Sequence, residues 1–98
     1  MSPTVKLLIS HHVISRKDSR DIPGTYELKP EETVGSFISR LASSNRDRWK
    51  SIWDQEENSF MHYIIPLVND ISIDRTKIFE IVLHDGDKLT LNRLLSGG

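Results

Sequence analysis

The sequence predicts an α+β domain in which a mixed β-sheet wraps around one main amphipathic helix. Two strand-like stretches come first, a long amphipathic stretch follows, and further strand-like stretches make up the second half of the chain. A hairpin followed by a long helical crossover brings the first and last strands parallel and side by side in the centre of the sheet. The helix then covers one face, which is the arrangement of a β-grasp.

The N-terminal hairpin is predicted from two short stretches and the polar segment between them. Val5–Ile9 is an apolar run of strand length, with Val13-Ile14 as a candidate extension. Ser15–Gly24 is polar, charged and closed by Pro-Gly, which is typical of a hairpin loop. Apolar and polar residues alternate in Thr25–Lys29, so this stretch is expected to be a half-buried second strand.

The main helix is predicted from a capping residue and an apolar stripe. Thr33 is a suitable N-cap because its hydroxyl can accept a hydrogen bond from the first turn. Ser43–Asn45 is expected to end the helix, and two tryptophans and an isoleucine at helical spacing predict a second helical segment from about Arg46 to Asp54. The apolar residues at helical spacing in the main helix are Val34, Phe37, Ile38, Leu41 and Ala42.

The second half of the chain predicts further strands separated by turns. Tyr63–Val68 reads as a strand whose Pro66 suggests an edge or a bulge. The turns are expected at Asn69-Asp70 and at Asp85-Gly86-Asp87, where Gly86 can supply a positive φ. The last strand follows in Lys88–Asn92, in which leucines alternate with polar residues.

Composition limits the classes of function. Ninety-eight residues make one domain, and a net charge of −1 without a basic block gives no electrostatic footprint for nucleic acid. The absence of cysteine excludes disulfides, thiolate metal sites and a cysteine nucleophile. Since the N-terminus lacks the regions of a signal peptide and no apolar run could span a bilayer, we expect a cytoplasmic protein without a membrane partner.

Several polar residues could carry chemistry, but a structural role is favoured for each. Asp85 and Asp87 could hold a metal or act as a general base, although the leucines on either side favour a turn. His11 and His12 would point to opposite faces of a strand and have no third ligand nearby, so a solvated pair is favoured and no metal site is expected.

The two tryptophans have a functional and a structural interpretation. Trp49 and Trp53 could anchor a partner, but packing in the core of their own domain is favoured. The sequence does not indicate a nucleophile next to a base, a glycine-rich loop that could bind phosphate, or a pair of catalytic carboxylates. The chain is expected to be a substrate of enzymes and not an enzyme, with the small subunit of a synthase complex as a possible role.

The last two residues, Gly97-Gly98, follow the Asp85-Gly86-Asp87 turn by eleven residues. Because glycine has no Cβ, such a tail can enter a narrow channel and bring its carboxylate to the active site of another protein. A carboxylate presented in this way can be activated as an acyl-phosphate. An inert terminus is the alternative. Leu94 and Leu95 either form an exposed docking surface or pack back onto the domain, and the sequence leaves both open.

These motifs together resemble the MoaD/ThiS sulfur-carrier family, the prokaryotic relatives of ubiquitin. The matching elements are Leu67-Val68-Asn69, the seven residues from Leu83 to Leu89, and Gly97-Gly98 at a similar distance from the turn. Asp47-Arg48-Trp49 is similar to a segment of the molybdopterin-synthase small subunit. The stretch from Asn69 to Asp85 is longer than is usual for the family.

The resemblance implies a ubiquitin-like β-grasp domain over residues 1–92 and a flexible tail over residues 93–98. It implies that a partner adenylyltransferase of the ubiquitin-activating type binds the domain and that Gly98 becomes an acyl-adenylate and then a thiocarboxylate. A synthase subunit or a target protein would accept the sulfur. ATP and magnesium belong to the partner, so the chain is expected to have no cofactor and no metal of its own. The tail residues that would contact the partner are Arg93, Leu94, Leu95, Ser96 and Gly97.

Two other functions fit the same sequence. The chain could be a protein modifier whose Gly98 becomes linked to lysines through an isopeptide bond, because this reaction shares the adenylate. It could also be a β-grasp interaction module whose Gly-Gly is never activated. The pathway that receives the sulfur, molybdopterin-type cofactor biosynthesis or a related one, is not determined by the sequence.

Overall fold

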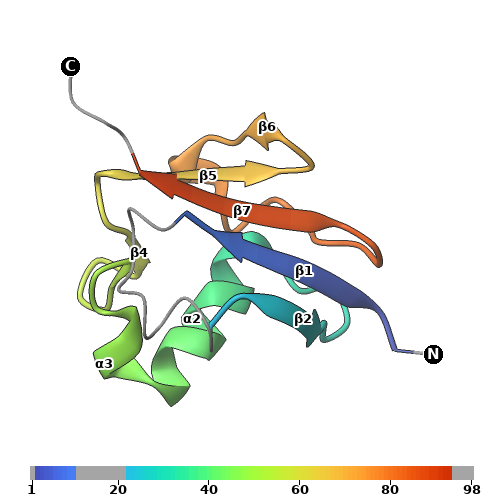
Figure 1. Ribbon diagram of the computed structural model, residues 1–98, viewed down its shortest axis with the longest axis horizontal. Coiled ribbons are helices and arrows are strands. Elements are labelled where there is room, and N and C mark those ends of the chain that lie inside the picture. Colours follow the sequence, from blue (N-terminus) through green and yellow to red (C-terminus); the bar gives the residue numbers. More distant parts are fainter. Residues whose placement is uncertain (1, 11–21, 94–98) are drawn as a thin grey trace.

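The computed structural model describes residues 2–10 and 22–93 of the chain (Figure 1). Five strands form a mixed sheet in the order β2-β1-β7-β5-β6. The parallel pair β1 and β7 lies in the centre, and helix α2 (Val34–Ser44) crosses one face, so the predicted ubiquitin-like β-grasp is confirmed (Figure 1). The strands are β1 Thr4–Ile9, β2 Gly24–Glu27, β5 Ile64–Val68, β6 Ile71–Ser72 and β7 Lys88–Arg93.

Alternation along the central strands divides the sheet into a buried inner face and an outer face. In the parallel register Leu7 lies beside Leu89, and both side chains are fully buried, as is Leu91. Polar residues occupy the positions between the leucines of β7, and these side chains point to the opposite face because strand residues alternate. The inner face therefore packs against α2 and leaves the outer face for other contacts.

Local chemistry fixes both ends of α2. The Thr33 Oγ1 accepts a hydrogen bond from the Ser36 N–H at 3.1 Å, and the Ser36 Oγ accepts one from the Thr33 N–H at 2.8 Å, which together form a capping box. The helix ends at Ser44 with Asn45 as its C-cap. The predicted stripe is confirmed by the burial of Val34, Phe37, Ile38 and Ala42, whereas Leu41 lies at the border of the core and is half-buried.

The prediction of a second helix to Asp54 is wrong in its length. Helix α3 covers only Arg46–Trp49, and Trp53 begins strand β3 (Trp53–Asp54), which pairs with β4 (Ser59–Phe60). The Ile52 carbonyl accepts a hydrogen bond from the Met61 N–H at 2.8 Å, so the chain leaves the helix to form a small hairpin. The Trp53 ring packs edge-on against Phe60 at 5.2 Å. This packing buries the apolar residue without helical geometry.

Pro66 explains why the edge strand β6 is short. Strand β5 pairs with β7 on one side and with β6 on the other. The Pro66 carbonyl accepts a hydrogen bond from the Ile73 N–H at 3.0 Å, one residue beyond β6. Proline cannot donate the return bond at this point, so the β5–β6 ladder stops there. Strand β5 lies between β7 and β6, so the prediction of an edge strand at Pro66 is wrong.

The segment between β6 and β7 is tied to two other parts of the molecule. It begins with a short 3-10 helix η1 (Arg75–Lys77), and the Arg75 guanidinium donates to the carbonyls of Phe60, Met61 and His62. Farther along, the Ile78 carbonyl accepts a hydrogen bond from Gly35 at 2.8 Å. A Cβ on Gly35 would lie 2.8 Å from the ring of Phe79, so the absence of a side chain lets this segment approach α2.

A partly buried ion pair joins the β2–α2 linker to the helix. Glu32 is only 6% exposed, and its carboxylate accepts hydrogen bonds from the Arg40 guanidinium at 2.8 and 2.7 Å and from the Lys29 N–H at 3.0 Å. Burial by itself raises the pKa of Glu32. The hydrogen bonds from Arg40 and Lys29, together with the Arg40 charge, lower the pKa by more than burial raises it. The net pKa lies below the ordinary value of 4.5, so the carboxylate is ionised at neutral pH.

The packing of α2 predicts unequal effects of two alanine substitutions. Phe37→Ala removes a fully buried ring that packs edge-on against Tyr26, and should cost about 3–5 kcal/mol of unfolding free energy. Leu41→Ala removes a half-buried side chain and should cost about 1–2 kcal/mol. Urea unfolding measures both losses. Equal losses would contradict the inward placement of the Phe37 side of the helix.

The Glu32–Arg40 pair predicts a defined loss of stability in acid. Because the folded-state pKa of Glu32 lies below its unfolded value of 4.5, the contribution of the pair is complete above about pH 4.5 and is lost as the pH falls through the folded-state pKa. Glu32→Gln should cost about 1–3 kcal/mol near neutral pH and less in acid, because it leaves the Arg40 guanidinium without its carboxylate. Urea unfolding of both proteins across this range measures the difference, and a constant difference would contradict the prediction.

Candidate functional site: the end of strand β7 and the outer face of the sheet

The predicted site residues follow the central strand of the sheet. Arg93 is the last residue of β7, is exposed, and lies opposite Ile64 of β5 in the antiparallel register. The first residue of the predicted tail is therefore part of the sheet. The other predicted site residues lie outside the described residues, namely Leu94, Leu95, Ser96, Gly97 and Gly98.

An aromatic side chain holds the end of β7. The Arg93 guanidinium carbon lies 5.0 Å from the centre of the Tyr63 ring, which is within range of a cation–π interaction. The Tyr63 hydroxyl donates a hydrogen bond to the Ser51 carbonyl, and the His62 ring packs edge-on at 5.4 Å. Tyr63 thus connects Arg93, the first residue of the predicted tail, to the α3–β3 turn. Sequence reasoning missed this residue because a contact between positions 63 and 93 has no periodic signal.

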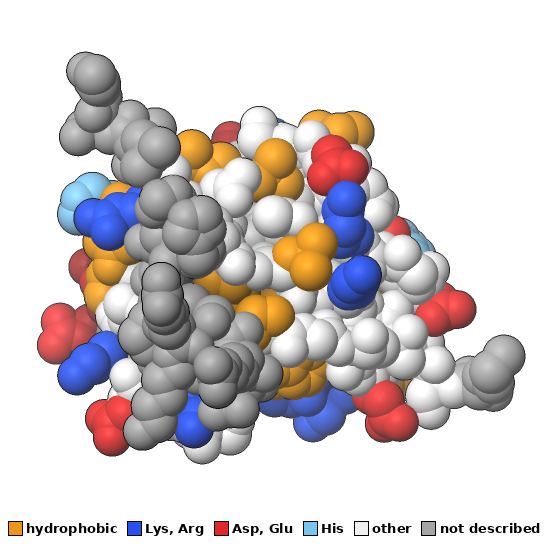
Figure 2. Space-filling model, in the orientation of Figure 1, with side chains coloured by type: hydrophobic (Ala, Val, Ile, Leu, Met, Phe, Trp, Pro, Cys, Tyr) orange, Lys and Arg blue, Asp and Glu red, His pale blue; other side chains and the backbone are white. Residues whose placement is uncertain are grey.

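The outer face of the sheet carries a row of partly exposed side chains that are apolar except for Thr90. Leu8 of β1 lies beside Thr90 of β7, and Thr90 lies opposite Leu67 of β5. All three are half-buried, and Ile65 continues the row toward the end of β7 opposite Asn92. Figure 2 shows hydrophobic side chains over the central strands on this face. We refer to Leu8, Ile65, Leu67 and Thr90 as the outer-face patch.

Charged residues border this patch on the side where β1 and β7 begin. Lys6 lies beside Lys88 in the parallel register, on the same face as Leu8 and Thr90. The Lys88 Nζ donates a hydrogen bond to Asp70 at 2.9 Å. Figure 2 shows basic and acidic side chains beside the apolar ones. The outer face therefore combines an apolar centre with a charged border, which is the anatomy of a protein-binding surface.

The motifs that carried the family resemblance form a hydrogen-bond network, referred to here as the lock, between the β5–β6 turn and the turn before β7. The Asn69 side chain donates from Nδ2 to Asp87 at 3.0 Å, and its Oδ1 accepts from the Lys88 N–H at 3.0 Å. The second Asp87 oxygen accepts from the His84 N–H at 2.8 Å. Asn69 adopts a φ of 51°, a left-handed conformation that asparagine tolerates. The lock fixes the β5–β6 turn against the start of β7.

The acidic residues of the second turn are structural, as expected. The Asp85 carboxylate accepts a hydrogen bond from the Thr4 N–H at 2.9 Å, which joins the turn to β1. Gly86 has a φ of 89°, a conformation that glycine adopts without steric cost. Within residues 2–10 and 22–93, no cluster of three histidine, aspartate or glutamate side chains could hold a metal ion. His11 and His12 lie outside the described residues.

The two tryptophans belong to the core. Trp49 is 3% exposed and Trp53 is 1% exposed, so neither presents its ring to solvent. The interpretation of these residues as core is confirmed, and the interpretation as a partner anchor is wrong. Trp53 is covered on one side by Phe79, whose ring lies 6.4 Å away.

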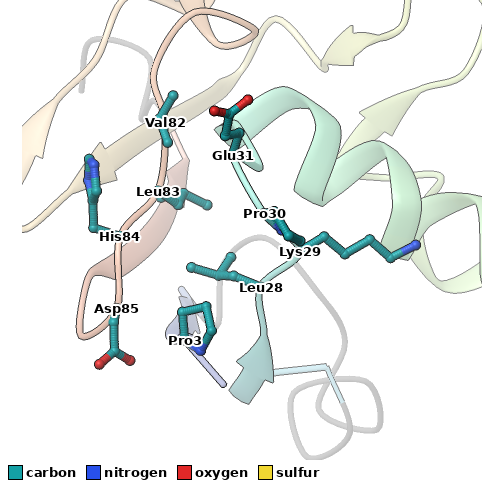
Figure 3. A pocket seen from close by; sticks show the side chains of 9 residues that line it. All are labelled: Pro3, Leu28, Lys29, Pro30, Glu31, Val82, Leu83, His84 and Asp85. Carbon is teal, nitrogen blue, oxygen red and sulfur yellow. The ribbon is translucent and has the colours of Figure 1, made fainter. Parts of the chain in front are cut away.

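A groove of about 600 Å³ lies at the edge of the sheet where β1 and β7 begin (Figure 3). It separates the linker that follows β2 from the segment that precedes β7. Leu28 and Leu83 point toward each other across it, whereas the Lys29 side chain is directed away. Sequence reasoning did not predict this groove, because its two walls are more than fifty residues apart along the chain. The lining residues are Pro3, Leu28, Lys29, Pro30, Glu31, Val82, Leu83, His84 and Asp85.

Comparison with known proteins supports the fold. No protein-family model and no curated protein matches the sequence. The structure of small archaeal modifier protein 1 from Haloferax volcanii matches with a TM-score of 0.72 at 12% identity, over 95% of this chain and 99% of that chain. Small archaeal modifier protein 1 from Methanosarcina acetivorans matches with a TM-score of 0.68 at 18% identity, over 100% and 99% of the two chains.

A third solved structure, Urm1 from Trypanosoma brucei, matches with a TM-score of 0.65 at 18% identity, over 99% of this chain and 97% of that chain. Because these identities are low, the comparisons establish the fold alone. The chain therefore has the ubiquitin-like β-grasp fold.

None of the helices in the described part of the chain has the length and apolar character needed to cross a membrane.

The contact between Arg93 and Tyr63 predicts a local effect at the end of β7. Tyr63→Leu removes the ring, so the Arg93 side-chain protons should lose their ring-current shift and the Arg93 amide should become more mobile on the nanosecond timescale. NMR chemical shifts and the heteronuclear NOE of Arg93 measure both effects.

Tyr63→Phe is the matched control because it keeps the ring and loses only the hydroxyl bond to Ser51. This variant should retain the ring-current shift of Arg93. If the two variants give the same Arg93 signals, the ring does not hold the end of β7.

Proposed function

We propose that this chain is a ubiquitin-like sulfur carrier whose Gly98 carboxylate is adenylated by a partner enzyme and then converted into a thiocarboxylate. The observation that carries the proposal is the position of Gly97-Gly98, eleven residues after the turn at which the central strand β7 begins. The last described residue of that strand, Arg93, is only five positions from Gly98. The family resemblance of the turn motifs supports the same function.

Adenylation is needed because a carboxylate is a poor electrophile until one of its oxygens becomes part of a good leaving group. A carboxylate oxygen of Gly98 attacks the α-phosphorus of ATP, the bond to the β-phosphate breaks, and pyrophosphate leaves. The terminal sulfur of a partner persulfide then attacks the acyl carbon and AMP leaves. A thiol breaks the S–S bond of the resulting acyl disulfide, which leaves a thiocarboxylate on Gly98 and a disulfide on the sulfur donor.

The chain contributes recognition, and the partner contributes the catalytic groups, ATP and magnesium. The outer-face patch offers an apolar surface beside the strand that leads to the tail. Tyr63 holds Arg93 at the end of β7. Leu94, Leu95 and Ser96 then contact the partner, and Gly97 lets the chain pass through a narrow channel. We expect the reaction to take place in the cytoplasm.

A second candidate function is that of a protein modifier. Two of the solved structures with this fold carry the name small archaeal modifier protein. In this function the adenylate reacts through a thioester or directly with a lysine amine, and Gly98 becomes linked to the target by an isopeptide bond. The first step is the same, so the fate of Gly98 distinguishes the two functions. For the carrier, the sulfur acceptor is a synthase subunit, as in molybdopterin-type biosynthesis, or a target protein.

The proposal predicts sulfur at Gly98 in the protein purified from its native host. Part of the protein should be heavier by one exchange of oxygen for sulfur, and the intact mass should show Gly98 as the last residue. Because the chain has no cysteine, a thiol-selective alkylating reagent should label this fraction at the C-terminus alone. The label should disappear in cells that lack the partner adenylyltransferase.

Two variants serve as controls for the tail. Deletion of Gly97-Gly98 should abolish the labelled fraction and leave the melting temperature unchanged, because the deletion removes no residue of the described core. Gly97→Val adds a β-branched side chain, so activation should fall steeply while circular dichroism stays the same. Lysine-linked Gly98 without any thiocarboxylate would favour the modifier, and the absence of both species would favour an interaction module without activation.

A further inference from the structure

The groove shown in Figure 3 is formed before any partner binds, because hydrogen bonds fix its walls. The Leu28 N–H donates to the Pro3 carbonyl at 2.8 Å, and the Leu83 N–H donates to the Glu32 carbonyl at 2.8 Å. The Thr4 N–H donates to the Asp85 carboxylate at 2.9 Å and closes the end of the groove near Pro3. A segment that enters the groove therefore meets a rigid surface, which lowers the entropic cost of binding.

The floor of the groove is apolar and of a size that suits side chains. Leu28 and Leu83 face each other, and Pro3 and Pro30 complete the lining (Figure 3). Val82 extends the apolar surface to the rim, where its side chain is 39% exposed. A volume of about 600 Å³ can accept one or two aliphatic side chains of a partner together with the backbone that carries them.

The charged residues at the groove indicate which charge the bound segment should carry. Glu31 and Asp85 are exposed and lie toward opposite ends of the groove, whereas the Lys29 side chain is directed away from it (Figure 3). Glu31 also adopts a φ of 56°, a left-handed conformation that a glutamate adopts only at a cost in energy. Carboxylates at both ends favour a cationic side chain next to the apolar ones.

The groove and Arg93 lie at opposite ends of the same strand. The groove-lining segment 82–85 precedes β7, and Arg93 ends it. Six residues of extended strand span about 17 Å between their first and last Cα atoms. A ligand in the groove and a partner at Arg93 therefore contact opposite ends of this strand.

We propose that this groove binds an extended segment of a partner protein that places one or two aliphatic side chains on the floor and a lysine or arginine beside Glu31 or Asp85. This binding uses no residue of the tail, so it is independent of the activation of Gly98. It gives the domain a second surface for choosing a partner.

The experiment is an NMR titration of the full chain with the blocked tetrapeptide Lys-Leu-Leu-Lys. Amide shifts should concentrate at Glu31, Val82, His84 and Asp85, and the affinity should fall as salt is added. Glu31→Gln should weaken binding about two- to fivefold, the range expected for one exposed charge pair. Lys29→Gln should leave the affinity unchanged or slightly raise it, because that side chain is directed away from the groove.

Two further comparisons make each outcome decisive. The peptide Glu-Leu-Leu-Glu should produce no shifts at the groove, and equal binding of both peptides would overturn the assignment of a cationic partner. Shifts elsewhere, or none, would overturn the site. Concentration-dependent shifts of the same residues without peptide would show that a second copy of the chain occupies the groove, and would overturn the choice of a partner protein.

The variants also separate this inference from the proposed function. A chain that lacks Gly97-Gly98 should bind Lys-Leu-Leu-Lys with unchanged affinity, whereas it cannot carry sulfur. Val82→Thr should weaken peptide binding and leave the thiocarboxylate fraction unchanged. Thermal unfolding of each variant shows that the fold is retained. Glu31→Gly should keep or raise the melting temperature, since glycine relieves the left-handed φ, and should still weaken binding.

Discussion

The parallel pairing of β1 with β7 is the contact on which the rest of the structure depends. It joins position 7 to position 89 of a 98-residue chain and buries both leucines completely in the centre of the sheet. Because the two strands are parallel, the intervening chain has to cross over, and α2 makes that crossing over the inner face. This contact closes almost the whole chain into one loop, so the described core depends on β7.

The motifs that made the sequence recognisable act mainly on this pairing. Asn69, Asp85 and Asp87 place the start of β7 through hydrogen bonds to the β5–β6 turn and to Thr4. These hydrogen bonds give the three residues structural roles. The resemblance in these residues therefore indicates how the central strands are aligned, because the same residues place the start of β7. The only part of the resemblance that concerns chemistry is the pair of terminal glycines.

The sequence predicted features that depend on local periodicity and failed for contacts that join distant segments. The apolar run of β1, the alternation in β7, the apolar stripe of α2 and the Thr33 cap are local signals, and the structure has all of them. Trp53 has helical spacing from Trp49 but lies in β3, because Phe60 offers its ring a partner eleven positions after α3 ends. The Tyr63–Arg93 contact, the Arg75 guanidinium on three carbonyls and the groove each need tertiary structure to exist.

In the proposed function, a carrier with one reactive carboxylate has to distinguish its partners by other means. The tail would be offered to the activating enzyme and again to the acceptor, so the tail alone would not tell one from the other. Discrimination must therefore lie on the folded domain, whose inner face is already buried against α2. The outer-face patch lies beside the strand that leads to the tail, and the groove lies at the opposite end of that strand. One surface is bordered by Lys6 and by the Lys88–Asp70 pair, and the other by Glu31 and Asp85. This difference in charge allows two partners of different chemistry to bind the same domain.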